Sequence, residues 1–502
     1  MTHNATIHDL PDDVLLLIFK AVYSMSRKYP GRDNRSVSIF EADKDDVIWQ
    51  DEAVTSPSNL FPDSLVPVSR LWKDTLSSVS AFWTRLTIFV DRRPTPLSAI
   101  ISRLALSGER VLEITLTRRQ GSWSGTDLSE QARVNAAIAL LSVHMSRWKT
   151  LRLDVLHSSS VLRPHVAMHG DAANLVDLRL HSRLKDAPLL AYWSPLTYRG
   201  LYIETRPPLT VTTNRRHINQ QLRAPRMSEL QLDGVIFFAS YSHAPVTWMS
   251  VRKLTVTHFA SPRPGRFTAN MFLTCLNTMP ALRELTLVEV ALEFYEEAMP
   301  ALVHCGLQRC TFVDIPEQML TALVGLLRNS ELTSLTVKRC SMRRWAPGQW
   351  PLSSLTLEGI NKSDDVFQTL RAWPPRVLTV ENCAGFDKII LAALADPYIF
   401  CPDMEALALS GSRGISSREL RMMIEGRQGG ISDDDPVDPD VGFISTLRVT
   451  GCGELDPNDK GFFEEHAFLR QVEWDGQIIL EDFESDVDSV GWARADDYSD
   501  EE

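Results

Sequence analysis

A short pattern of apolar residues recurs along most of this chain and constrains its fold more than any other feature. Each copy places one apolar residue, two residues of any type, a second apolar residue, one further residue and a third apolar residue. The alternation within a copy predicts a short strand whose apolar side chains share one face. Clear copies are Val111/Ile114/Leu116, Leu175/Leu178/Leu180, Met227/Leu230/Leu232, Val251/Leu254/Val256, Leu282/Leu285/Leu287, Leu302/Cys305/Leu307, Leu332/Leu335/Val337, Leu352/Leu355/Leu357, Met404/Leu407/Leu409 and Ile444/Leu447/Val449. Weaker copies are Trp148/Leu151/Leu153, Leu201/Ile203, Leu378/Val380 and Leu469/Val472/Trp474.

The spacing of these copies indicates a leucine-rich-repeat solenoid. Most successive copies are separated by 20 to 31 residues, which lies in or near the 20 to 29 residue period of such repeats. Helices are predicted between copies, for example over 267–279, 316–328 and 417–425, and Ser416 with Glu419 has the spacing of a capping box. We therefore expect an α/β fold with a parallel sheet on the concave face and helices and loops outside.

Four cysteines give an independent indication of the same repeat. The consensus places Asn or Cys three residues after the last strand leucine, and Cys310, Cys340, Cys383 and Cys452 occupy that position. A small, weakly polar side chain suits a buried tight turn, where it bonds to neighbouring backbone. Metal ligation by Cys305 and Cys310 is the alternative, but the second pair that a zinc site needs is missing, so we expect no metal and no other cofactor.

Residues 1–92 do not follow the repeat. They contain Leu10-Pro11-Asp12-Asp13-Val14-Leu15 continuing through Ile18-Phe19, then Val68-Ser69-Arg70-Leu71-Trp72 within an apolar helical stretch over 65–76, and then Phe82-Trp83. These three blocks resemble the F-box family, with Ser69 where the family usually has Cys. A mostly acidic insert at about 24–64 separates the first two blocks, unlike the compact family module. A plain helical cap over the first repeat is the alternative interpretation.

The resemblance implies a substrate-receptor subunit of a cullin-RING (SCF-type) ubiquitin ligase. In that family the F-box binds a Skp-type adaptor, and the repeats hold a protein target near the ubiquitin-charged enzyme. A leucine-rich-repeat scaffold outside any ligase and a leucine-rich-repeat GTPase-activating protein are the alternatives. The adaptor-binding residues that the resemblance implies are Leu10, Pro11, Val14, Leu15, Ile18, Phe19, Leu65, Val68, Leu71, Trp72 and Trp83.

Such a receptor performs no bond chemistry, and the sequence shows no catalytic motif. It has no phosphate-binding loop, no His-Glu-x-x-His, no nucleophile elbow and no dinucleotide-binding glycine pattern. We therefore expect a protein-binding function and no enzymatic activity. Target binding is expected at Arg152, Arg179 and Tyr202, which occupy the exposed middle position of successive copies and predict a small basic and aromatic patch.

Charge, apolar runs and cysteine count limit the expected partners and the expected cellular compartment. The chain has 52 basic and 64 acidic residues, which argues against a nucleic-acid partner. Residues 481–502 hold ten of the acidic residues and one Arg, so we expect an acidic disordered tail after a repeat domain over 93–480. No apolar run approaches the roughly 18 residues needed to cross a bilayer, and no signal-peptide pattern is present. The seven cysteines, an odd number, favour reduced thiols, so we expect a cytoplasmic or nuclear protein with no membrane partner.

Overall fold

A computed structural model gives the architecture of most of the chain. Backbone contacts divide it into two compact units, residues 1–346 and 347–502. Both units are mixed α/β and are built on mostly parallel strands, and the described strands do not close into a barrel. The described residues are 10–27, 60–119, 122, 126–162, 168, 170–184, 222–234, 236–237, 248–260, 268–277, 279–293, 306–327, 331–341, 352–397, 400–429 and 443–481.

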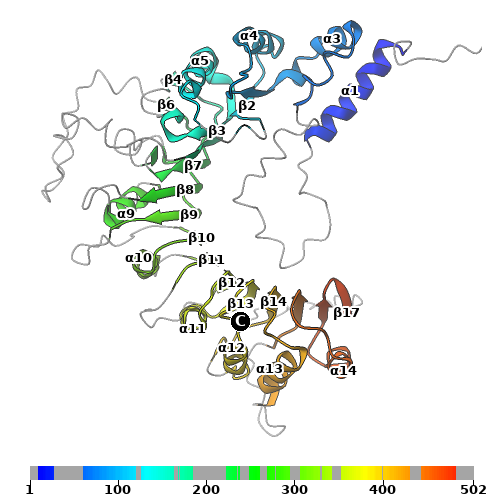
Figure 1. Ribbon diagram of the computed structural model, residues 1–502, viewed down its shortest axis with the longest axis vertical. Coiled ribbons are helices and arrows are strands. Elements are labelled where there is room, and N and C mark those ends of the chain that lie inside the picture. The colour runs from blue at the N-terminus through cyan, green and yellow to red at the C-terminus, as the bar shows by residue number, and fades with distance from the viewer. Residues whose placement is uncertain are drawn as a thin grey trace, which may run out of the picture. The chain divides into compact units, whose positions relative to one another are not determined.

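In the first unit the strands pair in chain order, each parallel to the next (Figure 1). The ladder begins before residue 92, the end expected for the N-terminal module. A separate parallel pair joins β4 (Gly170–Asp171) to β6 (Leu222–Arg223). The strands of the main ladder are β1 (Arg85–Phe89), β2 (Leu112–Thr117), β3 (Trp148–His157), β5 (Asp177–Leu184), β7 (Glu229–Asp233), β8 (Lys253–Ala260), β9 (Glu284–Ala291), β10 (Arg309–Val313) and β11 (Ser334–Lys338).

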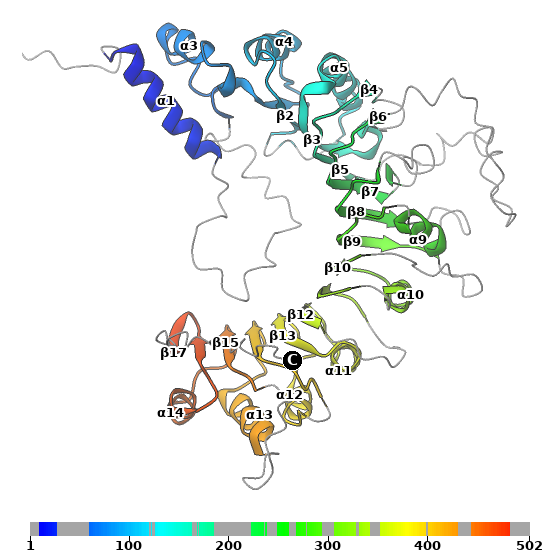
Figure 2. The same ribbon diagram turned by 180° about the vertical axis from the view of Figure 1, so that it is seen from behind.

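Helices in the first unit precede the ladder or connect its strands. Both views place α9 and α10 on the same side of the row of strands (Figures 1 and 2). The predicted helices over 267–279 and 316–328 are confirmed by α9 and α10. The helices are α1 (Asp12–Arg27), α3 (Arg70–Ser77), α4 (Leu97–Leu106), α5 (Glu130–Ser142), α9 (Ala269–Asn277) and α10 (Glu317–Leu327), with short 3-10 turns at Ser80–Trp83, Met145–Arg147 and Ser158–Ser160.

The second unit continues the alternation of strand and helix. Its strands are parallel from β12 to β16, and β17 returns antiparallel through a turn at Asp475 and Gly476, both left-handed as a two-residue hairpin requires. The predicted capping box is confirmed, because Ser416 N donates to Glu419 Oε2 at 2.9 Å. The elements are β12 (Leu352–Glu358), α11 (Ser363–Ala372), β13 (Pro375–Glu381), α12 (Lys388–Leu394), β14 (Ala406–Ser410), α13 (Ser417–Gly429), β15 (Thr446–Thr450), α14 (Pro457–Glu465), β16 (Gln471–Trp474) and β17 (Gln477–Glu481).

The strand register aligns the apolar pattern and corrects one of its copies. Cys310 pairs with Leu285 on one side and Leu335 on the other, so it is a buried strand position and not the expected turn. The copy at this point is therefore Leu307/Cys310/Phe312. The sequence was ambiguous because both triplets fit the pattern and share Leu307, while Leu302 and Cys305 lie outside the described residues.

From β8 to β11 one residue near the end of the strand, or directly after it, adopts a left-handed backbone conformation. In the first unit the positive φ angles are 53° at His258, 50° at Glu289, 51° at Asp314 and 51° at Arg339. The N–H of Asp314 donates to Lys338 O at 3.0 Å, which extends the strand pairing by one bond. These four strands thus share a left-handed residue at a corresponding place, in a conformation that costs energy for residues with a Cβ atom.

Asn and Gly occupy this left-handed position in the second unit. Asn382 has φ 51°, and Gly359, Gly411 and Gly451 have φ of 60° to 68°. The N–H of Asn382 donates to Ser410 O at 2.7 Å. Glycine suits position 411 because its left-handed φ strains a residue with a Cβ atom, and a Cβ there would also displace the Asn382 side chain, whose Oδ1 would lie 2.1 Å away.

Cysteines that follow the left-handed residue bond to neighbouring backbone. Cys340 Sγ accepts from Ile315 N at 3.3 Å, and Cys383 Sγ accepts from Ile360 N at 3.4 Å. Burial raises the pKa of each of these thiols to about 11, so both stay protonated at neutral pH. The role predicted for these two cysteines is confirmed, and Cys452, half-buried, occupies the corresponding position.

A buried arginine joins two helices of the second unit. Arg427, near the end of α13, is 2% exposed and donates to the carbonyls of Leu394, Phe400, Cys401 and Pro402 at 2.9 to 3.5 Å. Burial lowers the pKa of this guanidinium to about 10, so it remains charged at neutral pH. It satisfies carbonyl groups at and beyond the end of α12 that would otherwise lack a donor.

We predict that Arg427→Met lowers the free energy of unfolding by about 2 to 4 kcal/mol, because several buried carbonyl groups lose their donor. Arg418→Met is the matched control, since Arg418 lies exposed on the same helix. Urea unfolding followed by tryptophan fluorescence measures both. Equal effects of the two substitutions would contradict a stabilising role for the buried arginine.

Candidate functional site

Helix α1 packs one apolar face into the core of the N-terminal module. Leu15 and Phe19 are fully buried, and the Phe19 ring meets the Trp72 ring edge to face at 5.1 Å. Trp83 Nε1 donates to Leu76 O at 2.9 Å, which fixes the indole against α3. The buried core of the module is Leu15, Phe19, Phe61, Leu76, Phe82 and Trp83.

A second apolar face of α1 is exposed. Leu17, Ile18 and Met25 are 63%, 38% and 61% exposed, Ala21 is exposed, and Val14 is half-buried. Spacings of three and four residues place these side chains along one stripe of the helix. We call Val14, Leu17, Ile18, Ala21 and Met25 the α1 stripe. A continuous apolar stripe on an exposed helix marks an interaction surface.

Beside α1, α3 begins later than expected. The predicted helix over 65–76 is wrong at its start, because residues 61–68 form turns and Ser69 caps α3 by accepting from Trp72 N at 3.2 Å. The Ser that replaces the family's usual Cys therefore has a clear local role as an N-cap. Val68, just before the cap, is 51% exposed.

The structure separates the predicted adaptor-binding residues into two groups. Leu15, Phe19 and Trp83 are buried in the module's core, and Leu10, Leu65, Leu71 and Trp72 are half-buried against it. Pro11, Ile18 and Val68 are exposed, and Val14 belongs to the stripe. Leu17, Ala21 and Met25 were missed. Their signal was present in the helical spacing from Val14, but the residues of the F-box resemblance do not include them.

Arg152 and Arg179 meet on the sheet face, as expected from their register, but they do not form an unpaired basic patch. Asp177 accepts from both, from Arg152 Nη2 at 2.9 Å and from Arg179 Nε at 2.8 Å, and Glu229 accepts from Arg179 at 2.9 Å. Two positive and two negative groups leave this cluster neutral. The basic character predicted for the patch is therefore wrong.

The third residue expected in the patch is not the neighbour of Arg179. Strand β5 pairs with β7, which places Gln231 beside Arg179. Tyr202 lies outside the described residues. So do most of the acidic insert over 24–64 and the tail beyond Glu481, which is itself the last residue of β17.

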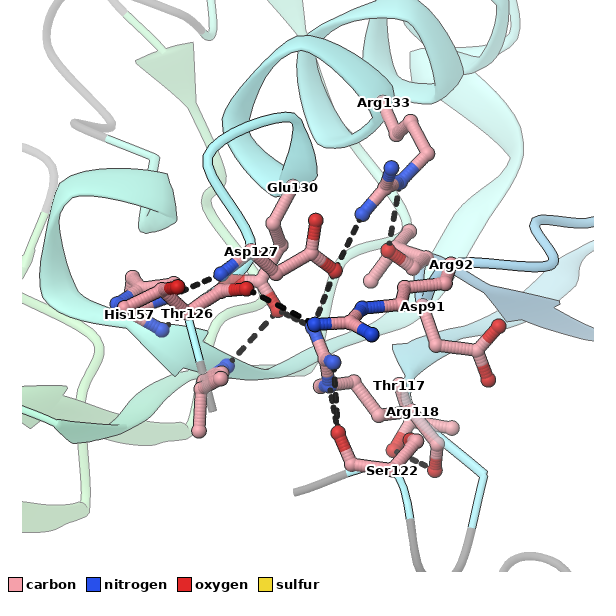
Figure 3. A network of polar contacts seen from close by, with 12 residues as sticks. Asp91, Arg92, Thr117, Arg118, Ser122, Thr126, Asp127, Glu130, Arg133 and His157 are labelled. Carbon is pink, nitrogen blue, oxygen red and sulfur yellow. Dashed lines mark hydrogen bonds and ion pairs between the residues drawn. The ribbon is translucent and has the colours of Figure 1, made fainter. Parts of the chain in front are cut away.

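A buried polar network that the sequence did not reveal lies at the ends of β2 and β3 and the start of α5. Arg118, which follows β2, is 2% exposed, and its Nη1 donates to Asp127 Oδ2 at 3.0 Å and to Glu130 Oε1 at 2.6 Å (Figure 3). Its Nη2 donates to Ser122 O at 2.6 Å, and Arg133 Nη2 donates to Asp127 Oδ2 at 2.5 Å. The network contains two cations and two carboxylates, so it is neutral as well as buried.

Glu130 connects this network to the backbone of the sheet. It is completely buried at the start of α5, and its carboxylate accepts from the N–H groups of Leu156 and His157 at 3.0 Å. His157 Nε2 accepts from Asp127 N at 3.2 Å. The network therefore fixes α5 against the end of β3, the strand that carries Arg152. We infer a positioning role for it.

The carboxylate of Asp127 makes this network sensitive to acid. Burial acts to raise the pKa of Asp127, but hydrogen bonds from Arg133 and Arg118 outweigh burial and hold the pKa below its ordinary value. The stability that Asp127 contributes is thus fully present above its ordinary pKa of about 3.9 and is lost as pH falls through the lower, folded-state value.

We predict that Asp127→Asn lowers the free energy of unfolding at pH 6 by about 1 to 3 kcal/mol. The difference from the parent should shrink as pH falls below about 4, because Asp127 of the unfolded parent then binds a proton while the folded carboxylate stays ionised until lower pH. Urea unfolding of both proteins from pH 6 to pH 3 measures this. A difference that stays constant over that range would contradict the assigned ion pairs.

The sequence matches no model of a known protein family and no curated protein. Among the residues that the structure describes, no helix is long and apolar enough to cross a membrane. The same residues contain no group of three or more His, Cys, Asp and Glu side chains that could hold a metal ion. The α1 stripe and the sheet face with Arg152 and Arg179 are two candidate interaction surfaces.

Proposed function

We propose that this protein is an F-box substrate receptor of an SCF-type ubiquitin ligase, with its strand–helix repeats being leucine-rich repeats that bind a protein target. The observation that carries the proposal is the α1 stripe. A helix that belongs to the three-block F-box resemblance keeps a full apolar face exposed after its other face has filled the module's core. That is the arrangement needed to dock on an apolar surface of a Skp-type adaptor.

The repeats support the second half of the proposal. In-register parallel strands, a left-handed residue after the strands and cysteines bonded to neighbouring backbone are properties that leucine-rich repeats combine. A receptor of this kind contributes effective concentration and orientation of its target and does no chemistry on it. The partner expected at the α1 stripe is the adaptor, and through it the cullin-RING ligase.

We predict that Leu17→Asp and Ile18→Asp each weaken adaptor binding by at least about 30-fold, since apolar anchors at interfaces commonly contribute about 2 kcal/mol or more. Lys20→Ala, on the same helix but outside the stripe, is the matched control and should bind like the parent. Biolayer interferometry with purified Skp-type adaptor measures the affinities. Because Leu17 and Ile18 are exposed, circular dichroism melting curves of the variants should stay close to that of the parent.

Two outcomes would reject the proposal. One is the failure of the parent protein to form a complex with the adaptor at micromolar concentration. The other is binding that survives both substitutions in the stripe. Leu15→Asp would not be informative, because Leu15 is buried and its substitution would disrupt the module itself.

The target surface is proposed to be the sheet face around Arg152 and Arg179. Charge reversal there would place new carboxylates beside Asp177, which is 7% exposed and already bonded to both arginines. Arg152→Gln and Arg179→Gln are therefore the better variants, because they remove charge with less internal repulsion. Reduced capture of a target identified by affinity purification would support this face, and unchanged capture would move the target elsewhere.

A further inference from the structure

Two histidines meet on the sheet face that carries Arg152 and Arg179. His181 belongs to β5 and His258 lies near the end of β8, and their ring centres are 5.8 Å apart. Strand β7 lies between their strands, so the two backbones are separated by roughly 9.6 Å, two strand spacings. The two side chains therefore lean toward each other across the intervening strand.

Each ring is held by a carboxylate at the same nitrogen. His181 Nδ1 lies 2.9 Å from Asp154 Oδ1, and His258 Nδ1 lies 2.9 Å from Glu289 Oε2. A carboxylate accepts a hydrogen bond, so each neutral ring carries its proton on Nδ1 and its lone pair on Nε2. Within the described part of the chain, neither Nε2 forms a hydrogen bond.

The surroundings hold this pair in place. The side chain of Asp154 is 4% exposed, and Arg183 lies 3.6 Å from its second oxygen, so the carboxylate behind His181 is fixed. His258 adopts the left-handed backbone with φ 53°, which turns its side chain away from the regular alternation of β8. Two oriented imidazoles with carboxylates behind them are the arrangement found at protein metal sites.

We propose that His181 and His258 bind one divalent transition-metal ion of the zinc, nickel or copper class through their Nε2 atoms, with Asp154 and Glu289 as positioning residues. Metal–nitrogen distances of about 2.0 to 2.1 Å allow a single ion to reach two rings at this separation. Imidazole suits these ions, whereas calcium and magnesium prefer oxygen. The protein supplies two ligands, so the other coordination positions take water or a donor from a bound protein.

Zinc titration of the full-length protein, stripped of metal with a chelator, tests this site by calorimetry. We expect one equivalent of zinc in the parent and a loss of affinity of at least tenfold in His181→Gln and in His258→Asn. Asn is chosen at 258 because it tolerates a left-handed backbone. Since the chain has 12 histidines, His144→Gln is the control and should bind zinc like the parent.

The positioning residue gives a second readout. Asp154→Asn should weaken zinc binding by about 10-fold to 100-fold while both ligands remain. Electron paramagnetic resonance of the parent with one equivalent of Cu²⁺ should show coupling to two imidazole nitrogens, which needs no variant to fold. Coupling to one nitrogen, no zinc binding at millimolar concentration, or unchanged affinity in both histidine variants would overturn the site.

This site does not rest on the function proposed above. His181 and His258 are far in sequence from α1 and belong to a different surface, so His181→Gln should leave adaptor binding unchanged. Zinc binding without adaptor binding would reject only the ligase proposal. Adaptor binding without zinc binding would reject only the metal site.

Discussion

The register of the parallel strands is the constraint on which the other features depend. Because parallel neighbours such as β9, β10 and β11 align residue for residue, positions that share a place in the repeat form rows across these strands. A one-residue shift would exchange the buried and exposed faces. The row of left-handed residues after the strands, with its backbone hydrogen bonds and its cysteines, secures this register at one end of each strand.

The same rows explain the properties of the exposed face. Arg152 and Arg179 are neighbours because their strands are in register, and for the same reason they share Asp177. His181 and Asp154 are paired two positions further along the same strands. Exposed charges on this face are therefore arranged as short neutral clusters, so recognition of a target there would depend on geometry more than on net charge.

The repeating strands and several helices follow directly from the sequence, because strand alternation and helix caps are local signals. The errors have physical causes. The triplet at Leu307 was ambiguous since two overlapping patterns fit equally, and only pairing with Leu285 and Leu335 decides between them. Apolar periods say nothing about the partners of polar residues, so the buried network of Arg118, Asp127 and Glu130 becomes evident only when α5 and β3 are placed side by side.

For the candidate site, the sequence predicted the helix but not which of its apolar faces stays exposed. Periodicity shows which positions of α1 are apolar, and it cannot say which apolar face the rest of the module covers. The structure assigns Leu15 and Phe19 to the core and leaves Leu17, Ile18 and Met25 exposed. An exposed apolar stripe favours the proposed docking helix over a plain helical cap, whose apolar groups would all be used internally.

Hydrogen–deuterium exchange of the full-length protein, with and without a Skp-type adaptor, tests the proposed docking helix most directly. If α1 docks through its stripe, peptides covering residues 12–27 should exchange more slowly in the complex, and peptides from the strands of the second unit should not change. A complex that forms while residues 12–27 exchange at an unaltered rate would contradict the assignment of α1 as the adaptor-binding helix.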